Sequence, residues 1–111
     1  MATTPTVLIS PVYAPVAAAA LYTEAGTFSG IDKCTVTNVS GNTVTLSMYL
    51  VPSGGTAGPS NLIMSSRSIA AGECYTCPEM VGHVVWLGES VWALAGTASA
   101  LVVRMSGRHK A

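Results

Sequence analysis

The sequence predicts an all-β fold: a single antiparallel β-sandwich (jelly-roll or Ig-like) with an extended N-terminal arm. Stretches of about seven residues that mix apolar and polar side chains recur about every ten residues, and turn residues such as glycine, asparagine and serine separate them. No stretch repeats its apolar residues convincingly with the period of a helix. The 111 residues are enough for one hydrophobic core. We therefore predict a single sandwich domain.

The best-patterned strand covers residues 43–51. Its aliphatic side chains fall on one face of an extended chain, and the other face carries hydroxyl groups and a tyrosine. The first set is Val44, Leu46, Met48 and Leu50, and the second is Thr43, Thr45, Ser47 and Tyr49. A helix would scatter the four aliphatic side chains around its circumference. This pattern predicts a half-buried strand, which runs directly into a loop rich in glycine and proline.

Further strands are predicted on both sides of this one. They cover residues 17–23, 31–39, 62–69, 73–78, 80–87, 90–96 and 100–106, with short turns between them. In the stretch 90–96, Val91 and Ala93 alternate with Trp92 and Leu94. If the small residues face the core, Trp92 is predicted to anchor a subunit interface. In the alternative, Trp92 lies in the core and the small residues lie under a partner.

The N-terminal residues 1–16 contain three prolines among apolar side chains. Because proline fixes φ and lacks an amide donor, this stretch is predicted to be extended. Its apolar residues either form an edge strand of their own domain or dock on a neighbouring subunit. The interface candidates are Val7, Leu8, Ile9, Val12, Tyr13 and Trp92. The predicted organisation is an arm (1–16), a sandwich (17–107) and a short basic tail (108–111), and deleting the arm is expected to abolish assembly but not folding.

The composition favours a surface that other subunits cover. Half of the residues are apolar and only 9% are charged, and charged residues are depleted in the cores of interfaces. The alternative is a free domain with a neutral surface of serine and threonine. The formal net charge is zero, so we expect no attraction to nucleic acid or to a membrane. An odd number of cysteines and the lack of a recognisable targeting segment favour synthesis in a cytoplasm.

The cysteine motif Cys74-Tyr-Thr-Cys77 lies in a predicted strand, where residues three apart point to opposite faces. Two buried or half-buried thiols are the simpler interpretation. The alternative is a zinc site with Cys74, Cys77, His83 and either Cys34 or His109, although a second paired ligand motif is missing. We therefore predict no metal site and no cofactor.

No catalytic residues are predicted. The loop 53–60 lacks the Lys-Ser/Thr ending of a phosphate-binding loop, and Pro59 stands where a helix would begin. Residues 88–92 lack the second glycine of a nucleophile elbow. The protein is therefore predicted not to be an enzyme. The loop is interpreted as an exposed connection, and secondarily as a contact tip, with the candidate residues Gly54, Gly55, Thr56, Gly58 and Pro59.

Several short motifs occur in a recognisable order. They are Cys34-Thr-Val-Thr-Asn38, Val44-Thr-Leu46, Tyr49-Leu-Val-Pro-Ser-Gly-Gly-Thr-Ala-Gly58, Ser68-Ile-Ala-Ala-Gly-Glu73, Gly88-Glu-Ser-Val-Trp-Ala93 and Val103-Arg-Met-Ser-Gly107. This succession resembles small virion structural proteins of tailed bacteriophages and prophages, which carry Leu-Thr-Asn, Val-Pro-Ser-Gly-Gly, Ile-Ala-Ala-Gly-Glu, Gly-Asp-Ser-Ile and a closing Ser-Gly. The resemblance covers about residues 17–107. Glu89 departs from the usual Asp, and the N-terminal arm has no counterpart.

The resemblance implies a non-enzymatic virion protein made in the bacterial host cytoplasm: a head decoration, a collar component or a tail component. Its expected partners are other copies of itself, in a homo-oligomer, and other virion proteins. The motifs are turn and strand chemistry, so they do not imply a position in the particle. An adhesin module that binds a host receptor or glycan through its loops is the alternative function.

Overall fold

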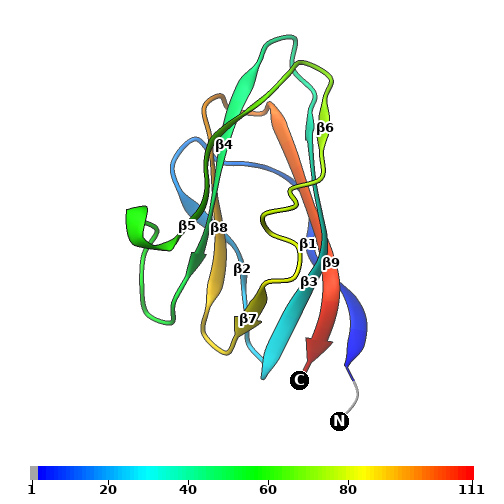
Figure 1. Ribbon diagram of the computed structural model, residues 1–111, viewed down its shortest axis with the longest axis vertical. Coiled ribbons are helices and arrows are strands. Elements are labelled where there is room, and N and C mark those ends of the chain that lie inside the picture. Colours follow the sequence, from blue (N-terminus) through cyan, green and yellow to red (C-terminus); the bar gives the residue numbers. More distant parts are fainter. Residues whose placement is uncertain (1–2) are drawn as a thin grey trace.

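The computed structural model describes residues 3–111, which form two antiparallel β-sheets packed face to face (Figure 1). The strands are β1 (Thr4–Tyr13), β2 (Ala19–Thr23), β3 (Phe28–Asn38), β4 (Val44–Val51), β5 (Leu62–Ile69), β6 (Cys74–Tyr75), β7 (Val84–Trp86), β8 (Ser90–Ala95) and β9 (Leu101–Lys110). A single 3-10 turn, η1 (Pro59–Asn61), lies between β4 and β5. Within residues 3–111, no helix has the length and apolar character needed to cross a membrane. The predicted all-β sandwich is confirmed.

The strand order distinguishes between the two predicted kinds of sandwich. Sheet A has the order β1-β9-β3, with β6 and β7 both paired to the outer edge of β3. Sheet B has the order β2-β8-β4-β5. Only β4 and β5 are consecutive strands that pair with each other, and most other connections cross from one sheet to the other. This is the order of an eight-stranded jelly roll in which β6 and β7 share one position.

The core lies between the two sheets. On β4, Val44, Leu46 and Met48 are buried and Leu50 is half-buried, as the alternation predicts. Ser47, predicted to face outward, is also buried, and its hydroxyl accepts the N–H of Ser66 at 2.9 Å. The largest fully buried apolar side chains come from both sheets and from the β6–β7 connection: Ile31, Leu46, Met48, Ile69, Met80, Leu101 and Met105. Burying each such side chain stabilises the fold by roughly 1.5 to 3 kcal/mol. The sandwich therefore has one continuous core, as a chain of this length allows.

Two turns, at residues 70–73 and 86–89, have the same architecture. In each, the third residue is a glycine with positive φ, 75° at Gly72 and 85° at Gly88. The fourth residue is a glutamate whose backbone N–H donates to the carbonyl of the first residue at 2.9 Å. The glutamate carboxylate in turn accepts the N–H of the first residue, at 2.7 Å for Glu73 and 2.9 Å for Glu89. Two of the motifs that carry the resemblance are therefore one kind of turn.

Asn38 fixes the connection from β3 to β4. Its buried amide nitrogen donates to the carbonyls of Asn42 at 2.8 Å and of Ile69 at 2.9 Å. Its amide oxygen accepts the backbone N–H and the hydroxyl of Ser40. A buried amide with every partner supplied stabilises one conformation of the turn. The turn is in this way tied to the end of β5.

The strands β3 and β9 begin or end beyond their predicted bounds, and β6 and β7 are much shorter than predicted. Residues 108–111, expected to be a basic tail, include the end of β9, where Lys110 pairs with Phe28 and its carbonyl accepts the N–H of Thr27 at 2.9 Å. β3 begins three residues before the predicted strand because it pairs with this end of β9. β6 and β7 are short because residues 76–83 turn, with positive φ at Cys77 and Gly82.

Candidate functional site

The predicted N-terminal arm is the edge strand β1 of sheet A, antiparallel to β9 (Figure 1). Proline lacks an N–H to donate, so Pro5 and Pro11 suit an edge strand. The register shifts twice, between Val7 and Ile9 and between Ile9 and Val12, which indicates bulges. The first of the two alternatives for this segment, an edge strand on its own domain, is the arrangement in this structure.

The interface candidates in β1 separate into two groups. Leu8 and Ile9 are buried and belong to the core of this subunit. Val7, Val12 and Tyr13 are 52%, 41% and 50% exposed. Because the core already uses the first pair, only the second group remains available to a partner. Deleting the N-terminal segment would therefore remove core residues as well as surface residues.

Trp92 lies on the outer face of sheet B. Val91 and Ala93 on either side of it are fully buried, so the small residues face the core. The indole of Trp92 lies between Ala20 and Tyr49 on the neighbouring strands, and its Nε1–H donates to the Ser90 hydroxyl at 2.7 Å. This is the arrangement for which the sequence predicts an interface anchor, and that role stays a prediction.

The outer face of sheet B is uncharged over three strands. β2, β8 and β4 contain no aspartate, glutamate, lysine or arginine. Their outward side chains include Ala20, Tyr49, Trp92 and Leu94, and Arg67 on β5 is the only charged residue of the sheet. A partner that covers this face would not have to desolvate an unpaired charge.

The loop candidates lie between the end of β4 and the first residue of η1, which is Pro59 itself (Figure 1). Gly54, Gly55, Thr56 and Pro59 are exposed, and Gly58 is half-buried. The loop is held by its own hydrogen bonds, from Asn61 Nδ2 to the carbonyl of Thr56 at 2.9 Å and from Gly58 N to Asn61 Oδ1 at 3.0 Å. Pro59 begins η1, whereas we expected it to oppose a helix, because proline fits the first turn, where no N–H is needed.

The cysteines do not form a metal centre among residues 3–111, where no group of three or more His, Cys, Asp and Glu side chains could hold an ion. Cys34 and Cys77 are buried, and Cys74 is exposed. The hydrogen bond with Cys34 and burial raise the pKa of the Cys77 thiol. A raised pKa keeps a thiol protonated and unreactive. Over the same residues, no pocket is found.

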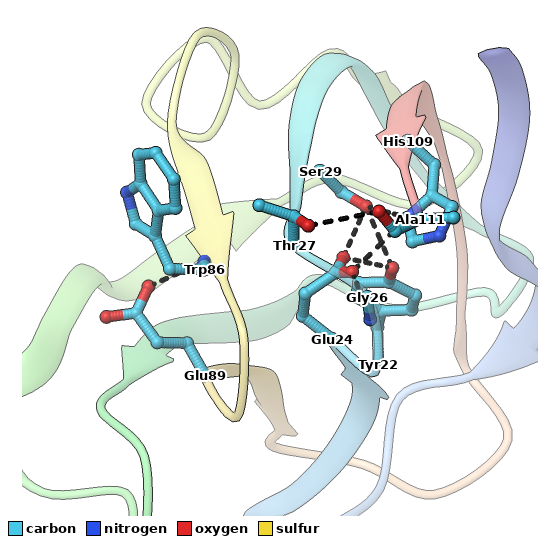
Figure 2. A network of polar contacts seen from close by, with 9 residues as sticks. All are labelled: Tyr22, Glu24, Gly26, Thr27, Ser29, Trp86, Glu89, His109 and Ala111. Carbon is cyan, nitrogen blue, oxygen red and sulfur yellow. Dashed lines mark hydrogen bonds and ion pairs between the residues drawn. The ribbon is translucent and has the colours of Figure 1, made fainter. Parts of the chain in front are cut away.

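A buried polar cluster joins the two sheets at one end of the sandwich (Figure 2). The side chain of Glu24, which follows β2, is fully buried and accepts hydrogen bonds from the hydroxyls of Tyr22, at 2.7 Å, and Ser29. Its second oxygen accepts the N–H of Gly26 at 2.8 Å and lies 3.3 Å from His109 Nδ1. Sequence reasoning missed this cluster because the pairing of Ser29 with His109 brings β3 and β9 together across 80 residues.

Serine, histidine and a carboxylate also form the triads of hydrolytic enzymes, but the hydrogen bonds between them run differently here. In a triad the serine hydroxyl donates to histidine, whose other nitrogen donates to the carboxylate. Here the hydroxyl of Ser29 donates to Glu24, so it accepts from His109 Nδ1 at 2.9 Å. Ser29 is also fully buried. The arrangement satisfies a buried carboxylate and does not present a nucleophile to solvent.

Acidification is expected to weaken the fold through Glu24. Burial raises the pKa of Glu24, but the hydrogen bonds from Ser29, Tyr22 and the Gly26 N–H, with the nearby His109, outweigh it and hold that pKa below its ordinary value. Because the pKa of Glu24 is lower in the folded state, its carboxylate stabilises the folded protein at pH values above the ordinary glutamate pKa of about 4.3. This stabilisation is lost as the pH falls through the folded-state pKa.

The test measures the urea concentration at which half of the protein is unfolded, at a series of pH values from neutral to acidic. The midpoint of the wild type should fall on acidification, and the fall should be smaller in Glu24→Gln. Glu79→Gln is the control variant. Hydrogen bonds from Tyr75 lower the pKa of the Glu79 carboxyl as well, so this variant measures how much of the acid dependence comes from Glu79. Equal acid dependence in the wild type and Glu24→Gln would contradict this assignment.

Comparisons with known proteins do not assign the chain to a family: no family model, curated protein or solved structure matches it.

Proposed function

We propose that the protein is a non-enzymatic virion structural component of a tailed bacteriophage: a head decoration, a collar component or a tail component that forms homo-oligomers. The observation that carries the proposal is the distribution of apolar surface. Val7, Val12 and Tyr13 are exposed on β1, and three strands of sheet B have an outer face without charge. Interface cores have this composition. The order of turn motifs supports the virion context, and jelly rolls are common in viral capsids, an analogy at the level of fold.

The assembly surface comprises the outward residues of β1 and the outer face of sheet B around Trp92. β1 and β2 are the edge strands of their sheets, and they make direct contacts with each other. The two parts meet at one side of the sandwich, where β1 and β2 lie next to each other, although Val7 and Tyr13 pair with outward residues of β9 and so face away from the outer face of sheet B. A partner that packs against this side can bury side chains from both sheets. Trp92 and Tyr13 belong to the residue types that contribute most to binding at interfaces.

Two charges on β1 are expected to prevent assembly and leave the domain folded. The double variant Val7→Asp with Tyr13→Asp places carboxylates at two positions that are half-exposed in the subunit. Burying these charges under a partner would be costly. Light scattering should show an oligomer for the wild type and a monomer for the double variant, and the variant should not join particles. Their urea midpoints should be similar.

The matched control is Ser65→Asp with Ser68→Asp. Both residues are exposed on β5, the edge strand of sheet B that lies farthest from β2. The two substitutions introduce the same two charges. The control should assemble like the wild type. Incorporation of the β1 variant at the wild-type level, or a monomeric wild type, would overturn the proposal.

A host-binding adhesin is the second candidate, and one observation favours it. Trp86 is 54% exposed and packs against Phe28, with 5.3 Å between the ring centroids. Exposed aromatic rings can stack on sugars, and lectins also use jelly rolls. Adsorption of the free protein to host cells, with competition against the phage, would distinguish this function. Assembly is the better-supported conclusion because a single aromatic pair is a small binding site and no pocket is found within residues 3–111.

A further inference from the structure

The outer face of sheet A collects four of the five cationic side chains of the chain. On β9, Leu101, Val103 and Met105 are buried, so the alternating residues Arg104, Arg108 and Lys110 face outward. Lys33 pairs with outward Ser106 and joins the same face. We call Lys33, Arg104, Arg108 and Lys110 the basic face. Sequence alone does not show this clustering, because the formal net charge is zero.

Only one carboxylate accompanies these four cations. Asp32 lies 3.2 Å from Arg108 in an exposed ion pair. Of the other acidic side chains, Glu24 is buried, Glu79 accepts the Tyr75 hydroxyl, and Glu73 and Glu89 each accept a backbone N–H in a turn, that of Glu89 lying at the aromatic end of the face. The face therefore has an excess of positive charge, which can attract and orient an acidic partner.

The basic face ends in an aromatic pair. Phe28 pairs with Lys110 on one side and with Trp86 on the other, so the three side chains share the outer face. At Gly30 the sheet lacks a side chain, and the guanidinium of Arg108 lies 3.7 Å from the position of a Cβ there. The face is thus a sheet surface of arginine and threonine bordered by tryptophan. Arginine and tryptophan are enriched among the residues that dominate protein–protein binding.

The charges determine which partner fits. A second copy docked through the same face would oppose like charges, because a twofold interface uses one patch on both sides. The outer face of sheet B offers no carboxylate, so covering the basic face with it would bury unpaired cations. A nucleic acid fits less well, since few free cations are present and most of the affinity for nucleic acid comes from neutralised phosphates.

We propose that the basic face docks on an acidic surface of a different protein. The inference rests on the proposed assembly function and adds a second, heterologous interface to it. The subunit then has two neighbouring interfaces. The exposed residues of β1 and the outer face of sheet B join copies of the chain, and the basic face on β9 and β3, which lies beside β1 on the outer face of sheet A, holds them to a partner of opposite charge.

The test uses poly-L-glutamate as the probe for an acidic protein surface, with the full-length protein. Binding followed by tryptophan fluorescence should be detectable at low ionic strength and should weaken as salt increases. Lys33→Glu with Arg104→Glu should reduce the affinity at least about ten-fold. Both residues are exposed, so the variant should keep its urea midpoint. A control outside the basic face is Arg67→Glu, which reverses the fifth cation, on β5.

Three results would overturn the inference: no binding of poly-L-glutamate, an equal loss of binding in Arg67→Glu, or tighter binding of a single-stranded oligonucleotide than of poly-L-glutamate. The last result would make nucleic acid the partner. The oligomer size of Lys33→Glu with Arg104→Glu is measured in the same samples and should equal that of the wild type. Loss of binding to poly-L-glutamate and loss of assembly through β1 are thus measured separately, so one proposal can fail without the other.

Discussion

Glu24→Ala is expected to lower the free energy of unfolding by about 3 to 5 kcal/mol, in line with the loss of one partner of a buried charged network. The truncation leaves the hydroxyls of Tyr22 and Ser29 and the N–H of Gly26 without their acceptor. It also opens a void at the point where the end of β2 meets β3 and β9. Because a domain of this size is stable by only about 5 to 15 kcal/mol, much of its stability depends on this carboxylate.

Two further substitutions distinguish the lost acceptor from a general effect of removing a glutamate. Glu24→Gln should cost less, about 1 to 2 kcal/mol, because hydroxyls can rotate to accept from the amide. Glu73→Ala removes an exposed carboxylate that accepts one backbone N–H, and it should cost about 1 kcal/mol or less. Urea unfolding measures all three, and equal costs for Glu24→Ala and Glu73→Ala would contradict the role of the cluster.

The strands could be predicted where local pattern and burial agree. β5 has the predicted bounds, and the alternation in β4 identifies Val44, Leu46 and Met48 as buried but misses the buried Ser47 on the other face. The ends of β3 and β9 could not be predicted in this way, because each is extended by pairing with the other strand. Pairing partners far apart in the sequence leave little trace in the local composition.

The same limit applies to the candidate sites. The sequence indicates that the N-terminal residues are extended and apolar, but the register of β1 on β9 decides which of them are buried. Leu8 and Ile9 enter the core, whereas Val7 and Tyr13 stay exposed. The Glu24 cluster and the basic face also depend on the alignment of β9 with β3. A net charge of zero gives no indication that positive charge gathers on one sheet.

The glycine of the closing Ser-Gly motif has a structural role that the sequence does not explain. Gly107 is buried in β9 and pairs with Ile31, next to a register shift in β3. A Cβ at this position would overlap the carbonyl oxygen of Gly30 and lie 3.3 Å from the backbone nitrogen of Asp32. These are backbone atoms of the neighbouring strand, so they cannot move aside without disrupting the pairing of β3 and β9.

Gly107→Ala is therefore expected to lower the free energy of unfolding by about 3 kcal/mol or more, at the upper end of overpacking effects. Gly41→Ala is the matched control, because a Cβ at Gly41 meets no atom within 4 Å, and its cost should stay within about 0.5 kcal/mol. Urea unfolding and near-ultraviolet circular dichroism measure both variants. A Gly107→Ala protein with the midpoint of the wild type would show that the two strands can separate at this point without loss of stability.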